Sequence, residues 1–196
     1  MAKRLSSVER KRQIIIATLD IVSERGFGNI TTAEIANRVG ISEGAVFKHF
    51  SSKAEILQEV LFFIRTSLLT LAQNIISKEI TADEKLKQIL YNIFSFFTQY
   101  PGVPKVIFSE QLHLADQNLK GILVEHVKSY SQIIHNVIVE GREKGLFNKD
   151  CDPELATEAF LGFVQVNVFK WSISGHAWCL TDRADKIFNY FIRTLV

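Results

Sequence analysis

The stretch from residue 30 to residue 53 reads ITTAEIANRVGISEGAVFKHFSSK; it is poor in acids and closes on a basic and aromatic turn. Lysine and histidine side chains bind phosphate oxygens, and lysine also reaches the O6 and N7 acceptors of guanine. Nowhere does the sequence show a nucleophile beside a base, a pair of catalytic carboxylates or a glycine loop that binds phosphate. The stretch therefore indicates recognition of a polyanion, and we predict that the chain is not an enzyme.

Small and hydroxyl side chains in the same stretch suit contact with a nucleic acid. Gly44 and Ala45 would keep the leading turn of a helix slim, and the Ala45 methyl group fits beside the methyl group of thymine. Thr31 and Thr32 stand at a helix start, where hydroxyls and free backbone N–H groups donate to phosphate. Lys48 is predicted to reach guanine or phosphate, the alternative being a solvated surface lysine.

Helix signals around this stretch predict the elements that position these residues. We expect helices from about Ser7 to Arg25, from Thr32 to Val39 and from Glu43 to Phe50, with Ser42 capping the last one. The tight turn Gly40-Ile41-Ser42 joins the second helix to the third, because glycine adopts left-handed conformations readily. Val46 and Phe50 lie four residues apart and would hold the third helix to its domain. This is the spacing of a helix-turn-helix, whose second helix enters the major groove.

The rest of the chain is predicted to be helical, so the fold class is all-α with roughly nine helices. Apolar residues recur at helical spacing, and no convincing alternating strand pattern occurs. Capping boxes of the form S/T-x-x-E mark four helix starts, namely Ser6 with Glu9, Thr31 with Glu34, Ser52 with Glu55 and Thr81 with Glu84.

Charge divides the chain into a basic head and a mildly acidic body. Residues 1–53 hold nine Lys/Arg and five Asp/Glu, a net charge of +4, whereas residues 54–196 hold fourteen and sixteen, a net charge of −2. A compact basic head favours contact with a polyanion. We predict a helix-turn-helix domain over residues 1–51, with the helix-turn-helix at 31–50, and a helical effector-binding and dimerisation domain over residues 52–196.

The segment ITTAEIANRVGISEGAVFKHFSSKAEIL resembles the TetR-like (TetR/AcrR) transcriptional regulators. It carries their Thr-x-x-x-Ile-Ala start, their Gly-Ile-Ser turn and their Phe-Lys-His-Phe-x-x-Lys close. The resemblance implies contacts with the DNA backbone from Thr32, Phe47, His49 and Lys53, and contacts with bases or the groove floor from Ser42, Gly44, Ala45 and Lys48. A plain surface role is the alternative for His49.

Two residues of this segment, Phe47 and Glu43, affect which DNA contacts the resemblance implies. The family usually has tyrosine where this chain has Phe47, so the phosphate hydrogen bond of a hydroxyl is lost there and Phe47 would pack against sugar. Glu43 would face a polyanion, and we expect it to select against wrong bases or to accept a hydrogen bond from cytosine.

For the body, the resemblance implies homodimerisation and a small effector that changes the spacing of the two DNA-reading heads. A phenylalanine-rich group suits an apolar effector, with ordinary core packing as the alternative; its members are Phe62, Phe63, Phe94, Phe97 and Phe108. The segment from Glu154 to about Ser174 is apolar nearly all round and must be buried on more than one side. We expect it and the C-terminal helix to form the dimer interface through Phe160, Phe163, Phe169, Phe188 and Phe191.

The leading hypothesis is a homodimeric repressor released from a two-fold DNA operator by a small apolar effector. As an alternative, residues 101–127 loosely resemble the nucleoid-occlusion relatives within the same family, which act through a cell-division protein. Cys151 and Cys179 are expected to be reduced thiols, with a regulatory disulfide or reactive thiol as the alternative. No cofactor, metal site or membrane span is predicted, His113, His126 and His135 lack metal-ligand spacing, and the expected location is the cytoplasm.

Overall fold

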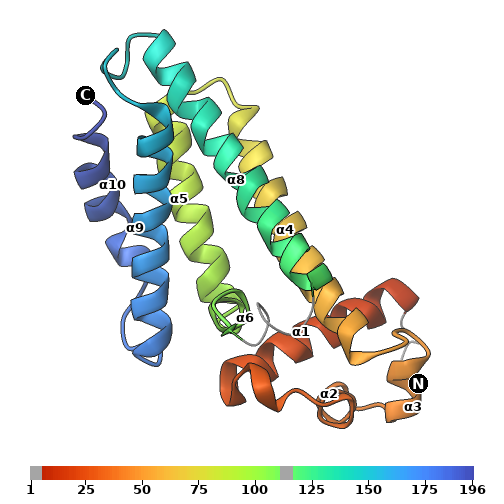
Figure 1. Ribbon diagram of the computed structural model, residues 1–196. Helices are drawn as coiled ribbons and strands as arrows, with labels where there is room; N and C mark the ends of the chain where they lie inside the picture. Colours follow the sequence, from red (N-terminus) through yellow and green to blue (C-terminus); the bar gives the residue numbers. More distant parts are fainter. Residues whose placement is uncertain (1–5, 111–116) are drawn as a thin grey trace. The chain divides into compact units, whose positions relative to one another are not determined.

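The computed structural model describes residues 6–110 and 117–196, and this part of the chain is built from helices (Figure 1). It contains nine α-helices, two short 3-10 helices and no strand, which confirms the predicted all-α class. The chain divides into two compact units, Met1–Arg65 with Tyr100–Leu123 and Thr66–Gln99 with Val124–Val196. The predicted domain boundary after residue 51 stays a prediction.

The first unit is organised around α1 (Ser7–Arg25). Its start carries a complete capping box, in which the Ser6 N–H donates to Glu9 Oε2 over 2.7 Å and the Glu9 N–H donates to Ser6 Oγ over 3.2 Å. One face of α1 is buried through Ile14, Leu19 and Ile21. The 3-10 helix η1 (Phe27–Asn29) then leads to α2 (Thr32–Val39) and α3 (Glu43–Phe47).

The short helix α6 (Val103–Ile107) packs closely on α1 within this unit. Gly102 precedes α6, and a Cβ atom there would lie 2.0 Å from the Leu19 carbonyl oxygen, so only glycine allows this approach. The Lys105 ammonium donates to the Ser23 carbonyl in the last turn of α1. A cation at this end of a helix also suits the helix dipole.

The second unit contains α5 (Ala82–Gln99), most of α8 (Gln117–Glu143), α9 (Pro153–Ile173) and α10 (Ala184–Ile192). In Figure 1, α5, α9 and α10 lie side by side, and the three helices contact one another. The 3-10 helix η2 (Thr181–Arg183) leads directly into α10.

Polar links join the helices of this unit. Lys85 of α5 is buried and its ammonium lies 2.8 Å from Glu140 Oε2 of α8. Hydrogen bonds from Lys144 and then from Lys85 hold the pKa of the Glu140 carboxyl below its usual value. The Tyr91 hydroxyl of α5 donates to Asp185 of α10 over 2.7 Å. These contacts link α5 to α8 and to α10.

Among the described residues, α4 (Lys53–Ile76) alone has the length and apolar composition that would let a helix cross a membrane. The core helix of a soluble protein passes the same test, so a single such helix is weak evidence. The side chains of Val60, Leu61, Ile64 and Leu68 along α4 are buried inside the protein.

Candidate nucleic-acid interface

Helices α2 and α3 form a compact helix-turn-helix near the lower edge of Figure 1. Gly40 ends α2 in the left-handed conformation, with φ of 74°, and the Ile41 N–H returns to the Ala36 carbonyl over 3.0 Å. Ser42 then caps α3, because its hydroxyl accepts from the Ala45 N–H over 3.2 Å. The turn predicted from Gly40-Ile41-Ser42 is confirmed in each of these contacts.

Helix α3 has a buried side and an exposed side. Val46 is fully buried and Phe50 is 1% exposed, as their spacing predicts. The Lys11 ammonium lies 4.9 Å from the centre of the Phe50 ring and covers it. Residues predicted to meet DNA lie on the exposed side: Ser42, Glu43, Gly44, Phe47 and Lys48 are exposed and Ala45 is partly exposed.

The end of α3 differs from the sequence prediction. The helix was expected to reach Phe50 but ends at Phe47, and the next residues form a tighter turn in which the His49 N–H donates to the Val46 carbonyl over 2.9 Å. This turn leaves His49 partly exposed, with Nδ1 3.3 Å from the hydroxyl oxygen of Ser7. The contact ties the turn to the first residue of α1.

Thr31 and Thr32 have different roles at the start of α2. The Thr31 hydroxyl oxygen accepts from the Glu34 N–H over 3.1 Å and so acts as the N-cap. The Thr32 hydroxyl donates to the carboxylate of Glu43, which opens α3. The hydroxyl proton of Thr32 is therefore donated to another side chain of the protein, whereas the sequence led us to expect that Thr32 contacts a phosphate.

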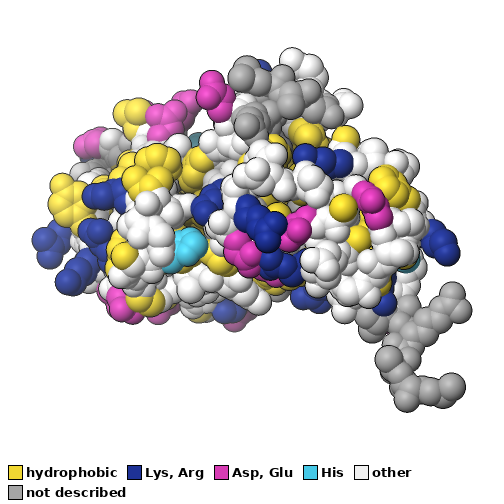
Figure 2. Space-filling model, turned by 90° about the horizontal axis from the view of Figure 1, so that it is seen from below, with side chains coloured by type: hydrophobic (Ala, Val, Ile, Leu, Met, Phe, Trp, Pro, Cys, Tyr) yellow, Lys and Arg dark blue, Asp and Glu magenta, His cyan; other side chains and the backbone are white. Residues whose placement is uncertain are grey.

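Ion pairs reduce the free positive charge of the first unit. Arg25 pairs with Glu34 over 3.2 Å, and Arg38 pairs with Glu24 over 2.5 Å. Within the described residues, Lys48 and Lys53 form no ion pair and both side chains are exposed. Figure 2 looks at the molecule from below, where basic side chains occur in separate groups with acidic ones among them.

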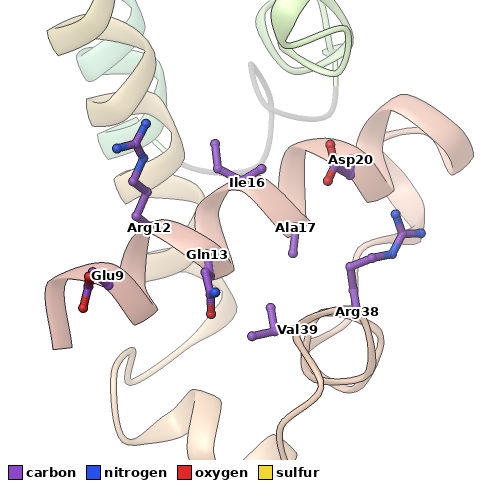
Figure 3. Close-up of a pocket in the computed structure, with 8 residues that line it drawn as sticks. All are labelled: Glu9, Arg12, Gln13, Ile16, Ala17, Asp20, Arg38 and Val39. Carbon is purple, nitrogen blue, oxygen red and sulfur yellow. The ribbon is translucent and has the colours of Figure 1, made fainter. Parts of the chain in front are cut away.

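An open groove of about 510 Å³ runs between α1 and α2 (Figure 3), a feature that no sequence pattern indicated. Its lining residues are Glu9, Arg12, Gln13, Ile16, Ala17, Asp20, Arg38 and Val39. Partial burial raises the pKa of the Asp20 carboxyl, while Arg38 acts in the opposite direction. Since the groove carries both signs of charge, it does not by itself favour a polyanion.

The phenylalanines predicted to contact an effector differ in exposure. Phe94 is fully buried and Phe97 is 6% exposed, both on α5. Phe62 is 36% exposed, whereas Phe63 and Phe108 are partly exposed. The rings of Phe63 and Tyr100 meet edge to face with centroids 5.2 Å apart.

Most aromatic residues predicted for the dimer interface lie inside the second unit. Phe160, Phe188 and Phe191 are buried, and the rings of Phe160 and Phe191 pack edge to face at 5.2 Å. Phe163 is partly exposed, and its ring packs against those of Tyr190 and Phe191. Phe169 is 47% exposed on α9, beside Val166 at 56% and Ile173 at 67%.

The remaining candidate residues form no additional centre in the part of the chain described. No three His, Cys, Asp or Glu side chains come together there as metal ligands. His113 falls outside the described residues, as does part of the segment that resembles the nucleoid-occlusion relatives. Cys151 and Cys179 are free of disulfides, the Cys179 sulfur lies 3.1 Å from the Thr181 hydroxyl oxygen, and burial raises the pKa of the Cys151 thiol.

Comparison with protein families gives two adjacent matches. Residues 14–60 match the model for bacterial regulatory proteins of the tetR family, and residues 65–194 match the model for the C-terminal region of YsiA-like proteins. A similar curated protein is the nucleoid occlusion factor SlmA of Salmonella dublin, 26% identical over 187 residues and aligned over 94% of each chain.

Solved structures of transcriptional regulators share the fold. FadR from Bacillus subtilis, determined in complex with stearoyl-CoA, superposes with a TM-score of 0.79 at 21% identity, covering 94% of this chain and 99% of that one. The ketosteroid transcriptional regulator KstR2 of Mycobacterium tuberculosis gives a TM-score of 0.80 at 21% identity over 95% of each chain.

Proposed function

The chain belongs to the tetR family of bacterial regulatory proteins and is a DNA-binding transcriptional regulator rather than an enzyme. From that premise we propose that it is a homodimeric repressor released from its operator by a small apolar effector. The observation that best supports DNA binding through α3 is that one side of this helix is buried and the other is exposed. Val46 and Phe50 hold it to the first unit, while its exposed side presents small and basic groups. Such a helix fits the major groove.

Each predicted DNA contact has a chemical role in this proposal. Gly44 and Ala45 let the α3 backbone approach the bases, and Lys48 reaches guanine or phosphate. His49 and Lys53 donate to phosphates, and Phe47 packs against sugar. Thr31 and Ser42, which cap α2 and α3, keep their hydroxyl protons free for the DNA, because each oxygen accepts its intrahelical bond.

Dimerisation is proposed to cover an apolar face of α9. Val166, Phe169 and Ile173 follow one another at spacings of three and four residues, so they share one face, and Leu155 lies on it three turns earlier. All four side chains are about half exposed or more in the single chain. A stripe of this kind suits a two-fold contact between identical surfaces. Two recognition helices would then read half-sites about 34–36 Å apart.

The effector is proposed to be an apolar or acylated small molecule bound in the body. The similarity in fold to a regulator solved with stearoyl-CoA supports this, and the buried phenylalanines of α5 give the body an apolar interior. An effector that prefers another head spacing weakens DNA binding by its coupling free energy, typically about 1–3 kcal/mol.

We expect stearoyl-CoA to raise the melting temperature of the full-length protein and to lower its operator affinity about 5- to 150-fold. Differential scanning fluorimetry and a DNA-binding titration measure the two effects, with coenzyme A alone as the matched control for the polar part. Free fatty acids and sterols complete the panel of probes. If no member of the panel stabilises the protein or weakens DNA binding, release by an apolar effector is wrong.

A second candidate function is to bind DNA and, from there, to act by contacting a protein partner. The 26% identity to a nucleoid occlusion factor over nearly the whole chain favours it. The two candidates differ in where the protein binds the chromosome. Chromatin immunoprecipitation showing few sites at promoters supports the repressor, and many scattered sites away from promoters support the second candidate. Both place the protein in the cytoplasm, on the chromosome.

A further inference from the structure

The hydrogen bond between Thr32 and Glu43 joins the first residues of α2 and α3 across the turn of the helix-turn-helix. Thr32 is partly exposed and Glu43 is exposed, as are Gly44 and Lys48. The hydroxyl donates to one carboxylate oxygen, Oε1. The other oxygen, Oε2, has no hydrogen-bond or ion-pair partner among the described residues.

A carboxylate is a poor group to place against DNA, since each phosphate repels it. It accepts hydrogen bonds and donates none, so the phosphate backbone offers it nothing. In the major groove the N4 amino group of cytosine is a donor that carboxylates accept from, and the acceptors of guanine exclude a carboxylate. Adenine also has an amino donor, N6, but the N7 acceptor beside it on the same base repels a carboxylate. A carboxylate held in one position at the start of a recognition helix therefore favours one base over the others.

Thr32 supplies that fixed position. A free glutamate side chain rotates about three bonds and would turn away from DNA at little cost. The hydroxyl bond restrains it and leaves Oε2 available. Thr32 is free for this task because Thr31, not Thr32, caps α2. The pairing also explains why the Thr32 proton does not point to solvent, where a phosphate would lie.

We propose that Glu43 is a specificity-determining residue that accepts a hydrogen bond from a cytosine in each operator half-site, and that Thr32 is the residue that positions it. This inference rests on the proposed DNA-binding function and deepens it. Glu43 contributes discrimination between sequences rather than affinity for DNA in general. Thr32 acts through Glu43 and not through a phosphate.

The test is selection of bound duplexes from a randomised pool by the full-length protein, followed by titration of each selected duplex. We expect wild type to require a C·G pair at one symmetric position of each half-site. Glu43→Gln should lose that preference about tenfold per half-site, within the range of a single base contact, and should bind unrelated duplex more tightly than wild type does. Thr32→Val, which keeps the side-chain shape, should weaken the same preference and no other.

Two further variants separate positioning from a general loss of structure or charge. Thr32→Ser restores the hydroxyl and should restore the wild-type preference. Glu24→Gln removes one negative charge from the pair with Arg38, outside the predicted DNA surface, and should leave the selected sequence unchanged.

Each other outcome has a definite meaning. If Glu43→Gln selects the same bases as wild type at every position, the role of Glu43 is refuted. If Thr32→Val binds all sequences more weakly by one factor and keeps the base preferences of wild type, Thr32 is a phosphate ligand and its positioning role is refuted. A wild-type protein that selects no sequence at all refutes the proposed DNA-binding function instead.

Discussion

Replacing Lys48 with alanine should weaken operator binding by about 1–3 kcal/mol for each half-site, and so by about 2–6 kcal/mol for the homodimer. Lys48 is exposed beside α3 and has no ion pair within the described part of the chain, so its ammonium is available to guanine or phosphate. Fluorescence anisotropy with a labelled operator duplex measures the loss. A base contact would relax preference at one position of each half-site, whereas a phosphate contact would lower affinity for every sequence and reduce the salt dependence by about one counterion per half-site.

A matched control for this variant is Lys149→Ala, which removes an exposed lysine from the second unit. It has the same change in charge and should bind the operator as wild type does. Circular dichroism should show equal helix content and melting temperature in both variants, because neither side chain is buried. If both lysine variants lose affinity equally, the effect is one of net charge and not of α3.

Placing a glutamate at Phe169 should break the homodimer and, with it, tight operator binding. Phe169 lies midway in the exposed apolar stripe of α9 and is 47% exposed in the single chain, so the variant protomer still folds. In a two-fold interface the added carboxylates would be buried without partners, at a cost of several kcal/mol. Sedimentation velocity should show monomers for Phe169→Glu at concentrations where wild type is a dimer, and the monomer should retain only half-site affinity.

Ser95→Glu is the matched control, since it adds one negative charge at an exposed position of α5. It should remain dimeric and bind the operator normally. A Phe169→Glu protein that stays dimeric and keeps full operator affinity would show that this face of α9 is not the interface.

Local signals made the helix-turn-helix predictable. Caps and glycine turns depend on residues three or four positions apart, and the caps by Ser6, Thr31 and Ser42 form as expected. Burial of Val46 and Phe50 followed from helical spacing alone.

The carboxylates of the expected capping boxes do not all accept from the backbone N–H of the N-cap residue. Glu9 completes its box with Ser6, but Glu34 turns to Arg25. Glu55 accepts from the backbone and hydroxyl of Ser51 instead of the Ser52 backbone, and these bonds lower its pKa. An exposed carboxylate has several partners of similar energy within reach, so the local motif does not decide between them.

Contacts that depend on tertiary geometry were beyond the sequence. Thr32 and Glu43 are eleven residues apart, and they meet only once the turn between α2 and α3 sets the angle of the helices. Sequence likewise does not separate a core aromatic residue from an interface one, because both environments are apolar. Phe160 and Phe191 were expected at a dimer contact, yet they pack against each other inside the unit.

The central claim is that the exposed side of α3 and the turn after it read DNA. The most direct measurement is a titration of wild type and the Lys48→Ala/His49→Ala double variant against operator and unrelated duplex, over rising salt. We predict that wild type prefers the operator, that its affinity falls steeply as salt displaces phosphate contacts, and that the folded double variant has lost that preference. A folded double variant that binds the operator as tightly as wild type does would contradict the claim.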